Sequence, residues 1–323
     1  MTIFDTGAGS LHGSEIASSL NAASEPPNQL RRILGMSDLV LMIVGTVIGS
    51  GIFLVPGVVL RAAGNSVPIA LMVWLVGGVL SLLGALTYGE LSAMKPQVGG
   101  LYVYIRDCFG PFPAFLFGWT MFFVISAGSV ATLAVAFGNY LGEFVQLSPL
   151  QIKIVAILMI SVITVVNVLG TRQSANLLNV TTAIKVGAIL SFGTVLLWRG
   201  THSVFGDANP AIGQTPGIVG FGLAMISVLW AYEGWQYVTY TAGETVNPQR
   251  VFPLAFLIGT AALIAIYIFA NLGYVAALGA SGVAGSTRVA ASALGVVVSH
   301  GAGKLVAVTI LISMFQRRER NYA

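Results

Sequence analysis

Eight long apolar segments dominate this sequence and limit what it can fold into. A helix needs about 20 consecutive apolar residues to cross the hydrocarbon core of a bilayer. The segments of about this length are residues 37–60, 67–93, 112–141, 150–169, 175–198, 216–241, 252–277 and 291–315. Their apolar runs are unbroken and lack the alternation of barrel strands. The sequence therefore predicts an all-α, polytopic membrane protein with eight spans.

The scarcity of charge excludes the main soluble classes. Only 8% of the 323 residues are charged, against about 25% in soluble domains. So little charge cannot cover a water-exposed surface of this size, which excludes an ordinary soluble enzyme, a nucleic-acid binder and a disordered chain. The net charge of +4 comes from Lys and Arg around and between the apolar segments, so it indicates no nucleic-acid partner.

The distribution of basic residues predicts the orientation, because cytoplasmic loops carry an excess of Lys and Arg. One side of the membrane receives Arg31, Arg32, Lys95, Arg106, Arg172, Arg250, Arg317, Arg318 and Arg320, and the other receives Arg61, Lys153, Arg199 and Arg288. We therefore expect a plasma-membrane protein with a cytoplasmic N-terminus. Residues 1–35 lack the apolar core of a secretory signal and are expected to form a mobile cytoplasmic tail.

The first apolar segment contains three glycines in seven residues, at Gly45, Gly49 and Gly51. Each glycine costs a helix about 1 kcal/mol relative to alanine. Close helix packing of the Gly-x-x-x-Gly kind is one explanation for Gly45 and Gly49. Gly51 points away from that face, so a local break in the helix explains the three glycines better.

The sixth segment carries Glu233 and Gly234 near its middle, where an unpaired carboxylate is expensive. The first and sixth segments are thus both interrupted at mid-depth, and matching interruptions in two halves of a chain are typical of a transporter site. The N-terminus of a half-helix attracts a carboxylate, while the exposed carbonyls of the other half accept from an ammonium. One site with both features suits a zwitterionic amino acid.

Four collinear stretches resemble the amino acid–polyamine–organocation (APC) permeases, and among them the L-type amino acid transporters. The stretches are residues 44–57, 88–104, 230–236 and 243–253, and the resemblance covers about residues 35–315. It implies a LeuT-like fold with two inverted five-helix repeats and usually twelve spans. Residues 36–198 would then hold the first repeat, spans one to five, and residues 216–315 an incomplete second repeat, spans six to eight.

The resemblance also implies a substrate site at the two breaks. The backbone of Ser50, Gly51 and Ile52, next to Gly49, would hold the substrate carboxylate. Thr46 and Val47 would line the ammonium side, together with carbonyls of Trp230, Ala231 and Glu233. Trp230 stands where the family has an aromatic that closes over the substrate, and Ile125 and Ser129 are candidates from the third helix. Two plainer interpretations remain open, namely a packed aromatic at Trp230 and, at Thr46, a hydroxyl bonded to its own helix.

Lys185 lies near the centre of the fifth segment, where a Lys costs about 2.5–3.5 kcal/mol on insertion scales. In sodium-independent relatives a fifth-helix Lys occupies the place of a sodium ion and braces the broken first helix. The resemblance therefore implies that Lys185 donates to carbonyls near Gly45 to Ile48. Coupling to protons is a further possibility, and a purely structural ammonium is the alternative.

The end of the sequence departs from the family. Eight spans are two fewer than the ten-helix core, and residues 316–323 form an aberrant basic tail. We therefore expect a truncated permease that is inactive alone. With a single cysteine, Cys108, and no His pair at helical spacing, we expect no disulfide, metal or cofactor.

The predicted function is secondary, sodium-independent amino acid transport by alternating access. A non-transporting amino acid sensor or binding subunit on the same fold is the main alternative. An enzyme is not expected, because the membrane-depth acids are few and scattered, and no channel filter is visible. Trp230 and Ile125 favour a neutral substrate, whereas Glu233 favours a cationic amino acid or polyamine. Exchange, proton symport and uniport are not distinguished.

Overall fold

The computed structural model describes residues 32–141, 145, 147–168, 171–204 and 218–297. The α-helices are α2 (Met36–Val47), α3 (Gly51–Ala62), α4 (Val67–Met94), α5 (Leu101–Phe109), α6 (Pro111–Thr120), α7 (Ala127–Leu141), α8 (Pro149–Val168), α9 (Thr171–Arg199), α10 (Ile218–Ala231), α11 (Pro248–Gly285) and α12 (Val289–Val297). A π-helical segment, η1 (Met121–Ser126), joins α6 to α7, and a 3₁₀ segment, η2 (Trp235–Glu244), precedes α11. The helical class expected from the sequence is confirmed for these residues.

Local sequence explains where several helices begin. Proline stands in the first turn of α4, α6 and α11, a position where its missing N–H is not needed. At the start of α2, Asp38 Oδ2 accepts the backbone N–H of Gly35 at 3.0 Å. Gly110 separates α5 from α6 with φ +93°, a conformation that favours glycine.

Four continuous helical stretches are long and apolar enough to cross a membrane within the described residues. They are α4, Pro111–Val135 through α6 and η1 into α7, Ala175–Arg199 in α9, and α11, and the bent pair α2 and α3 counts as a fifth. Eight spans were expected from the sequence. Helix α8 matches the expected span at 150–169 in place and length, although its apolar part, Pro149–Val165, is short for a crossing. Helix α10 is shorter than the span expected at 216–241, and α12 is described only to Val297. Residues 1–31 and 298–323 lie outside the described residues. They include most of the N-terminal tail expected at 1–35, most of the span expected at 291–315 and the basic tail expected at 316–323.

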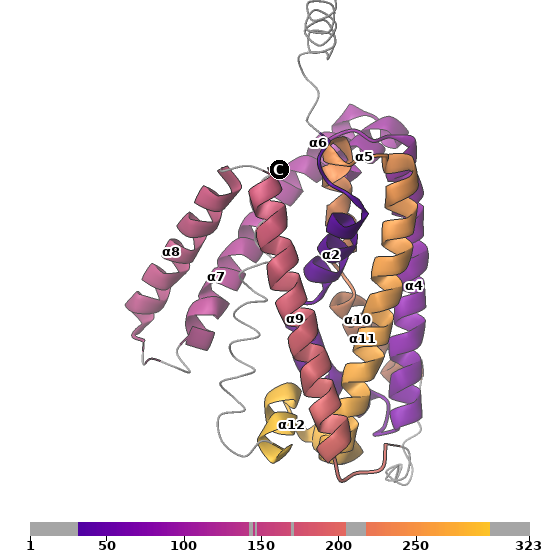
Figure 1. The fold of residues 1–323 in the computed structure, drawn as a ribbon, viewed down its shortest axis with the longest axis vertical. Helices are drawn as coiled ribbons and strands as arrows, with labels where there is room; N and C mark the ends of the chain where they lie inside the picture. The colour runs from indigo at the N-terminus through magenta and orange to yellow at the C-terminus, as the bar shows by residue number, and fades with distance from the viewer. Residues whose placement is uncertain (1–31, 142–144, 146, 169–170, 205–217, 298–323) are drawn as a thin grey trace, which may run out of the picture.

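The helices form a bundle with a hairpin beside it (Figure 1). Helix α2 packs against α9 and α11, which also contact each other, and α10 packs against α3 and α4. Most of the buried apolar side chains belong to this bundle. The hairpin of α7 and α8 stands apart and has its own small cluster of Ala134, Ala156, Met159 and Ile163. The bundle is therefore the part that positions the broken helices.

The outer surface of the bundle is apolar along its length. On α4, Met72, Leu75, Val79 and Leu83 are all at least 43% exposed, and their spacing of three or four residues places them on one helix face. Such a face suits contact with lipid rather than water.

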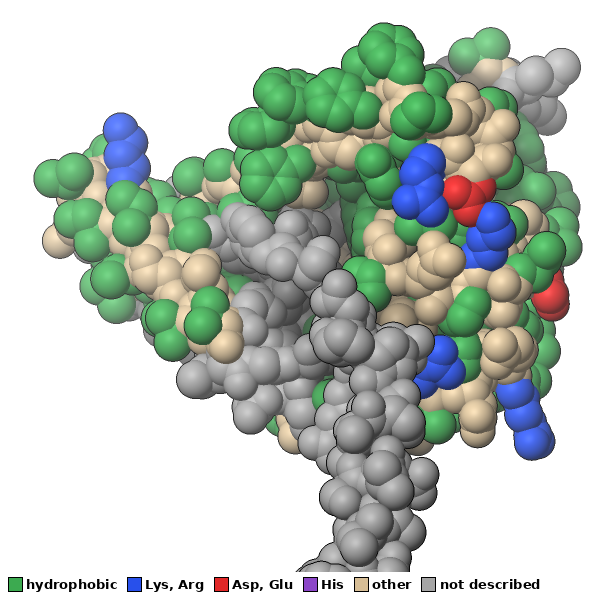
Figure 2. Space-filling model, turned by 90° about the horizontal axis from the view of Figure 1, so that it is seen from above, with side chains coloured by type: hydrophobic (Ala, Val, Ile, Leu, Met, Phe, Trp, Pro, Cys, Tyr) green, Lys and Arg blue, Asp and Glu red, His purple; other side chains and the backbone are tan. Residues whose placement is uncertain are grey.

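Figure 2 views the end where α5 lies, and shows Lys and Arg side chains next to acidic ones among a largely hydrophobic surface.

Charged residues around α5 pair at this end of the molecule. The Asp107 carboxylate accepts from Lys95 Nζ and, at 3.1 Å, from Arg106 Nε. The hydrogen bond from Lys95, followed by that from Arg106, holds the pKa of Asp107 below its usual value. The contact with Lys95, which follows the last residue of α4, ties α5 to the end of α4 on the side expected to be cytoplasmic, whereas the contact with Arg106 lies within α5.

Candidate functional site

The first expected break is present between α2 and α3. Helix α2 ends at Val47, Ile48 is extended (φ −67°, ψ 95°), and α3 begins at Gly51, with the two axes bent by 52°. Gly51 also lies against the end of α10, because a Cβ there would stand 3.1 Å from Ala231 Cβ. The glycines of this segment therefore permit both the interruption between α2 and α3 and the close approach of α3 to the end of α10.

The second expected break lies between α10 and η2. Helix α10 ends at Ala231, and Gly234 has φ +131° before the 3₁₀ segment begins at Trp235. A side chain at Gly234 would be strained by this φ, and its Cβ would stand 2.8 Å from Thr46 O. The two breaks therefore pack directly against one another at the level of Thr46 and Gly234.

Lys185 contacts the carbonyl end of α2. Its side chain is 1% exposed, and Nζ donates to Gly45 O and to Ile48 O, each at 2.9 Å. These carbonyls lie in the stretch, Gly45 to Ile48, that the resemblance implied Lys185 would reach. The last carbonyls of a helix lack intrahelical donors and carry partial negative charge, so an ammonium is well placed there.

The same face of α9 contacts α2 at two further levels. Thr182 Oγ1 donates to Leu41 O at 3.3 Å, and Asn179 Nδ2 donates to Asp38 Oδ1 at 2.7 Å. Asn179, Thr182 and Lys185 are three residues apart and so share one helix face. The buried carboxylate of Asp38 was not among the expected site residues, although an acid inside an apolar segment could have drawn attention to it.

Tyr267 of α11 was also missed by sequence reasoning. Its hydroxyl lies 3.2 Å from Val47 O, at the end of α2, and 3.0 Å from Ala231 O, at the end of α10. Its ring packs against Trp74 of α4, with centroids 5.4 Å apart, and against Tyr232, at 4.9 Å. The available signal was one of two tyrosines, Tyr267 and Tyr274, in the apolar run of α11, and each resembles any packed aromatic.

The structure favours the plainer interpretation of the Thr46 side chain. Its hydroxyl donates back to Met42 O at 2.8 Å or Ile43 O at 3.0 Å, and the residue is 4% exposed. Trp230 is 51% exposed, and its ring approaches the start of α3 at Gly51. The carbonyls of Val47 and Ala231, expected on the ammonium side, face the Tyr267 hydroxyl.

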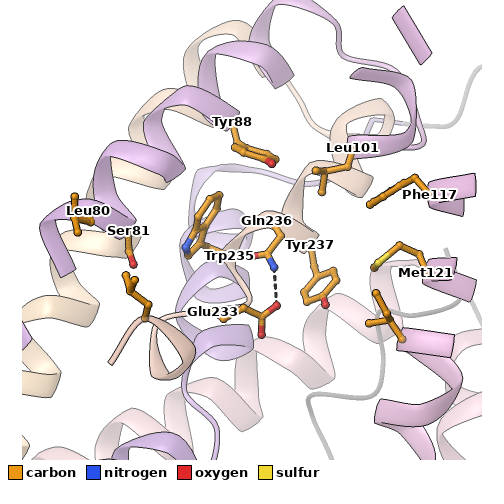
Figure 3. Close-up of a pocket in the computed structure, with 12 residues that line it drawn as sticks. Leu80, Ser81, Tyr88, Leu101, Phe117, Met121, Glu233, Trp235, Gln236 and Tyr237 are labelled. Atoms are coloured by element: carbon orange, nitrogen blue, oxygen red, sulfur yellow. Dashed lines mark hydrogen bonds between the residues drawn. The ribbon is translucent and has the colours of Figure 1, made fainter. Parts of the chain in front are cut away.

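A cavity of about 530 Å³ lies beside the second break, between α4, α5, the third span and η2 (Figure 3). It is lined by Leu80, Ser81, Tyr88, Leu101, Phe117, Met121, Ile125, Leu229, Glu233, Trp235, Gln236 and Tyr237. Most of its wall is apolar or aromatic, with a carboxylate, an amide and hydroxyl groups added. Ligand cavities with a few placed polar groups have this character.

Two of the expected site residues, Ile125 and Glu233, line this cavity. The expected residues at the breaks that do not line it are Thr46, Val47, Gly49, Ser50, Gly51, Ile52, Trp230 and Ala231, and Ser129 is exposed elsewhere on the third span. Ile125 belongs to η1, a π-helical segment that the sequence pattern did not indicate. Such segments are frequent at functional sites.

Gln236 holds Glu233 at the edge of the cavity. Its Nε2 donates to Glu233 Oε1 at 2.6 Å, and its Oε1 accepts the backbone N–H of Gly234 at 3.1 Å (Figure 3). The carboxylate is thereby tied to the backbone of the second break. Among the described residues, no group of three His, Cys, Asp or Glu side chains could hold a metal ion.

Comparisons with known proteins agree on one group. A family model described as amino acid permease matches residues 34–316. The chain is 32% identical over 293 residues to the serine/threonine exchanger SteT of Bacillus subtilis, covering 89% of this chain and 65% of that protein. It is 36% identical to the human b(0,+)-type amino acid transporter 1 (79% and 53%) and 37% identical to the human cystine/glutamate transporter (77% and 52%). The chain thus spans about half to two thirds of the length of these curated relatives.

Proposed function

The chain belongs to the amino acid permease family, and on that premise we propose that it moves amino acids across the membrane by alternating access around its two broken helices. The observation that carries this proposal is the meeting of the two breaks, where Gly234 packs on Thr46 O and Gly51 on Ala231. Interrupted helices that face one another in this way present backbone N–H groups and carbonyls that lack intrahelical partners, and such groups can contact a zwitterion.

The proposed site combines the breaks with the adjoining cavity. The N-terminus of α3 at Gly51 would hold the substrate carboxylate, and carbonyls at the ends of α2 and α10 would face the ammonium. Glu233 belongs to the second break and also lines the cavity, so the cavity would receive the substrate side chain. Ser50, Ile52, Trp230 and Ala231 remain proposed substrate contacts at the junction.

We further propose that transport is independent of sodium. The ammonium of Lys185 donates to Gly45 O and Ile48 O, and carbonyls at a helix end are the ligands that a sodium ion would otherwise use. A positive group already in that position leaves an ion no favourable place. The LeuT-like arrangement, with repeats at 36–198 and 216–315 and a cytoplasmic N-terminus, belongs to the same proposal.

The side chain of the substrate has two candidate chemistries. The apolar and aromatic wall, with Ile125 and Met121, suits a neutral side chain. Glu233 suits a cationic one, because a carboxylate at the edge of an apolar cavity is best stabilised by a positive partner. Competition between L-leucine and L-arginine for binding would decide between them.

The proposal is tested on the purified chain reconstituted into proteoliposomes. Uptake and equilibrium binding of labelled L-serine, L-leucine and L-arginine are measured with sodium or potassium outside. We expect saturable binding that is equal in the two salts. The sequence led us to expect no uptake by this chain alone, so robust uptake would overturn that expectation. Uptake that requires sodium would refute the proposed role of Lys185, and the absence of binding would refute the site. In a full-length relative, binding without flux would favour a sensor or binding subunit.

A further inference from the structure

We propose that the chain just before α2 forms a main-chain latch that ties the first broken span to the second, at the end of the bundle where α5 lies (Figure 1). Leu34 N donates to Glu244 O at 3.0 Å, and Val246 N donates to Leu34 O at 2.9 Å. These bonds make an isolated parallel β-bridge between Leu34 and Thr245. Ile33 N also donates to Glu244 O, at 2.9 Å. The latch thus pairs residues 33–34 with residues 244–246.

The second side of the latch belongs to the stretch 243–253, one of the four that resemble the permeases. There η2 ends at Glu244, Thr245 is extended (φ −90°, ψ 133°), and Asn247 is left-handed (φ 47°) just before α11 begins. Asparagine tolerates this left-handed turn. An extended piece between two helices needs partners for its main-chain groups from another part of the chain, and the residues before α2 supply them.

The latch is buried on one side and borders the surface on the other. Leu34 and Thr245 are each 0% exposed, and the Thr245 hydroxyl donates to Thr241 O at 2.9 Å within its own segment. Val246 is 41% exposed. A main-chain hydrogen bond that can be exchanged for one with water changes an equilibrium by only about two- to tenfold. A latch of this size can therefore open while the bundle stays folded.

The connection from the latch into α2 is itself held in place. Gly35 N donates to Asp38 Oδ2 at 3.0 Å, and Leu39 N donates to Gly35 O at 3.2 Å. Asp38 Oδ1 accepts from Asn179 Nδ2 of α9 at 2.7 Å. A displacement of the residues in the latch is therefore passed to the first turn of α2.

The latch and the breaks hold the same two segments at opposite ends. Helix α2 ends at the first break and η2 begins directly after the second, where Gly234 packs on Thr46 O. The latch joins the start of α2 to the end of η2. The two segments therefore move as one unit while the latch is closed, and its opening releases the end of α2 that is expected to be cytoplasmic.

The test compares Val246→Pro with Val246→Ala by hydrogen–deuterium exchange in detergent. Proline removes the N–H that donates to Leu34 O, and the extended Thr245 before it already has the conformation preferred there. Alanine keeps the N–H. In Val246→Pro we expect residues 33–39 and 239–245 to exchange about two- to tenfold faster, which is the effect of one net hydrogen bond. Val246→Ala should match the unaltered chain, and the α7 and α8 hairpin should be unchanged in both variants.

The response of residues 33–39 decides the outcome, because they lie far from position 246 in the sequence and meet it only in the latch. Faster exchange at 239–245 alone, no change in either segment, or an equal rise in Val246→Ala would overturn the proposal.

A cross-link decides if Val246→Pro does not fold or if the hairpin also exchanges faster. Leu34→Cys and Thr245→Cys are combined with Cys108→Ser, which removes the natural cysteine of this chain. Paired strands lie about 4.8 Å apart, and a disulfide spans Cα atoms about 4.4–6.8 Å apart. Oxidation should slow exchange at residues 35–39 at least about twofold, because the latch can no longer open. Equal exchange in the oxidised and reduced forms would overturn the proposal.

The role of the latch in transport rests on the proposed function, but its test does not. Hydrogen exchange needs no substrate and no flux. If the unaltered chain binds no amino acid, the proposed function fails while the exchange result stands by itself. If binding is present and residues 33–39 do not respond, the latch fails while the proposed function stands.

Discussion

Replacing Lys185 by Met tests how the first break is held. Methionine keeps much of the length and the apolar stem of the side chain but removes the ammonium. Gly45 O and Ile48 O, each 2.9 Å from Nζ, then lose this donor inside the bundle. The exposed Lys153 of α8 offers a matched control, Lys153→Met.

Two opposing terms set the expected stability change. Each buried carbonyl that loses its donor costs about 1–3 kcal/mol, or about 2–6 kcal/mol for two. Removing the ammonium from the membrane interior returns about 2.5–3.5 kcal/mol. The net loss is therefore no more than about 3.5 kcal/mol, and the variant should remain folded while the end of α2 loses its tie to α9.

The assay combines thermal unfolding with substrate binding in sodium and potassium. We expect Lys185→Met to lower the melting temperature modestly and to weaken amino acid binding at least about tenfold, which corresponds to about 1.4 kcal/mol. Lys185→Ala, which also opens space beside the carbonyls, should recover part of its stability in sodium but not in potassium. Binding at the unaltered affinity in Lys185→Met would refute the bracing role, and an unchanged response of uptake to a pH gradient would refute proton coupling through Lys185.

Three further changes test other parts of the structure. In thermal unfolding, Gly234→Ala should destabilise the chain by about 1–3 kcal/mol, because φ +131° is strained for alanine and its Cβ would stand 2.8 Å from Thr46 O. As a control, Gly222→Ala in α10 places its Cβ in open space and should show no loss of stability in the same measurement. Glu233→Gln should weaken L-arginine binding at least about tenfold and leave L-leucine binding unchanged if the cavity takes a cationic side chain, and equal effects on both in competition binding would reject that choice. Because Asp107 has a lowered pKa, its ion pairs stabilise the fold above the usual Asp pKa and are lost as pH falls through the folded pKa. Asp107→Asn should therefore flatten the decline in melting temperature below about pH 4, and an identical decline would show that the pairs contribute nothing.

The helix breaks were predictable because their cause is local. Gly45, Gly49 and Gly51 weaken a helix wherever it lies, and Gly234 next to a mid-span carboxylate does the same. The structure places an extended residue at Ile48 and a left-handed glycine at Gly234, as those signals indicated. Lys185 could be identified for a similar reason, since a single ammonium in an apolar run requires acceptors nearby.

The cavity and its lining could not be predicted in the same way. Tyr88, Trp235 and Tyr237 are ordinary aromatics in the sequence, and they form a wall only because α4 and η2 pack beside the third span. The exposed position of Trp230 and the π-helical segment around Ile125 likewise depend on neighbouring helices. The hydrophobic pattern predicts that a side chain lies in a membrane-spanning helix, but the packing of the helices decides which cavity that side chain lines.

The sequence by itself determined the membrane class, the two interruptions and the buried ammonium, because length, glycine placement and isolated charge act over a few adjacent residues. The tertiary structure alone decided which groups hold the interruptions together. Lys185 reaches a carbonyl 140 residues away, and Tyr267 joins two carbonyls that lie 220 and 36 residues from it. Hydrogen bonds at such separations arise from the packing of α9 and α11 against the broken helices, and a hydroxyl shared by two helix ends becomes visible only in that packing.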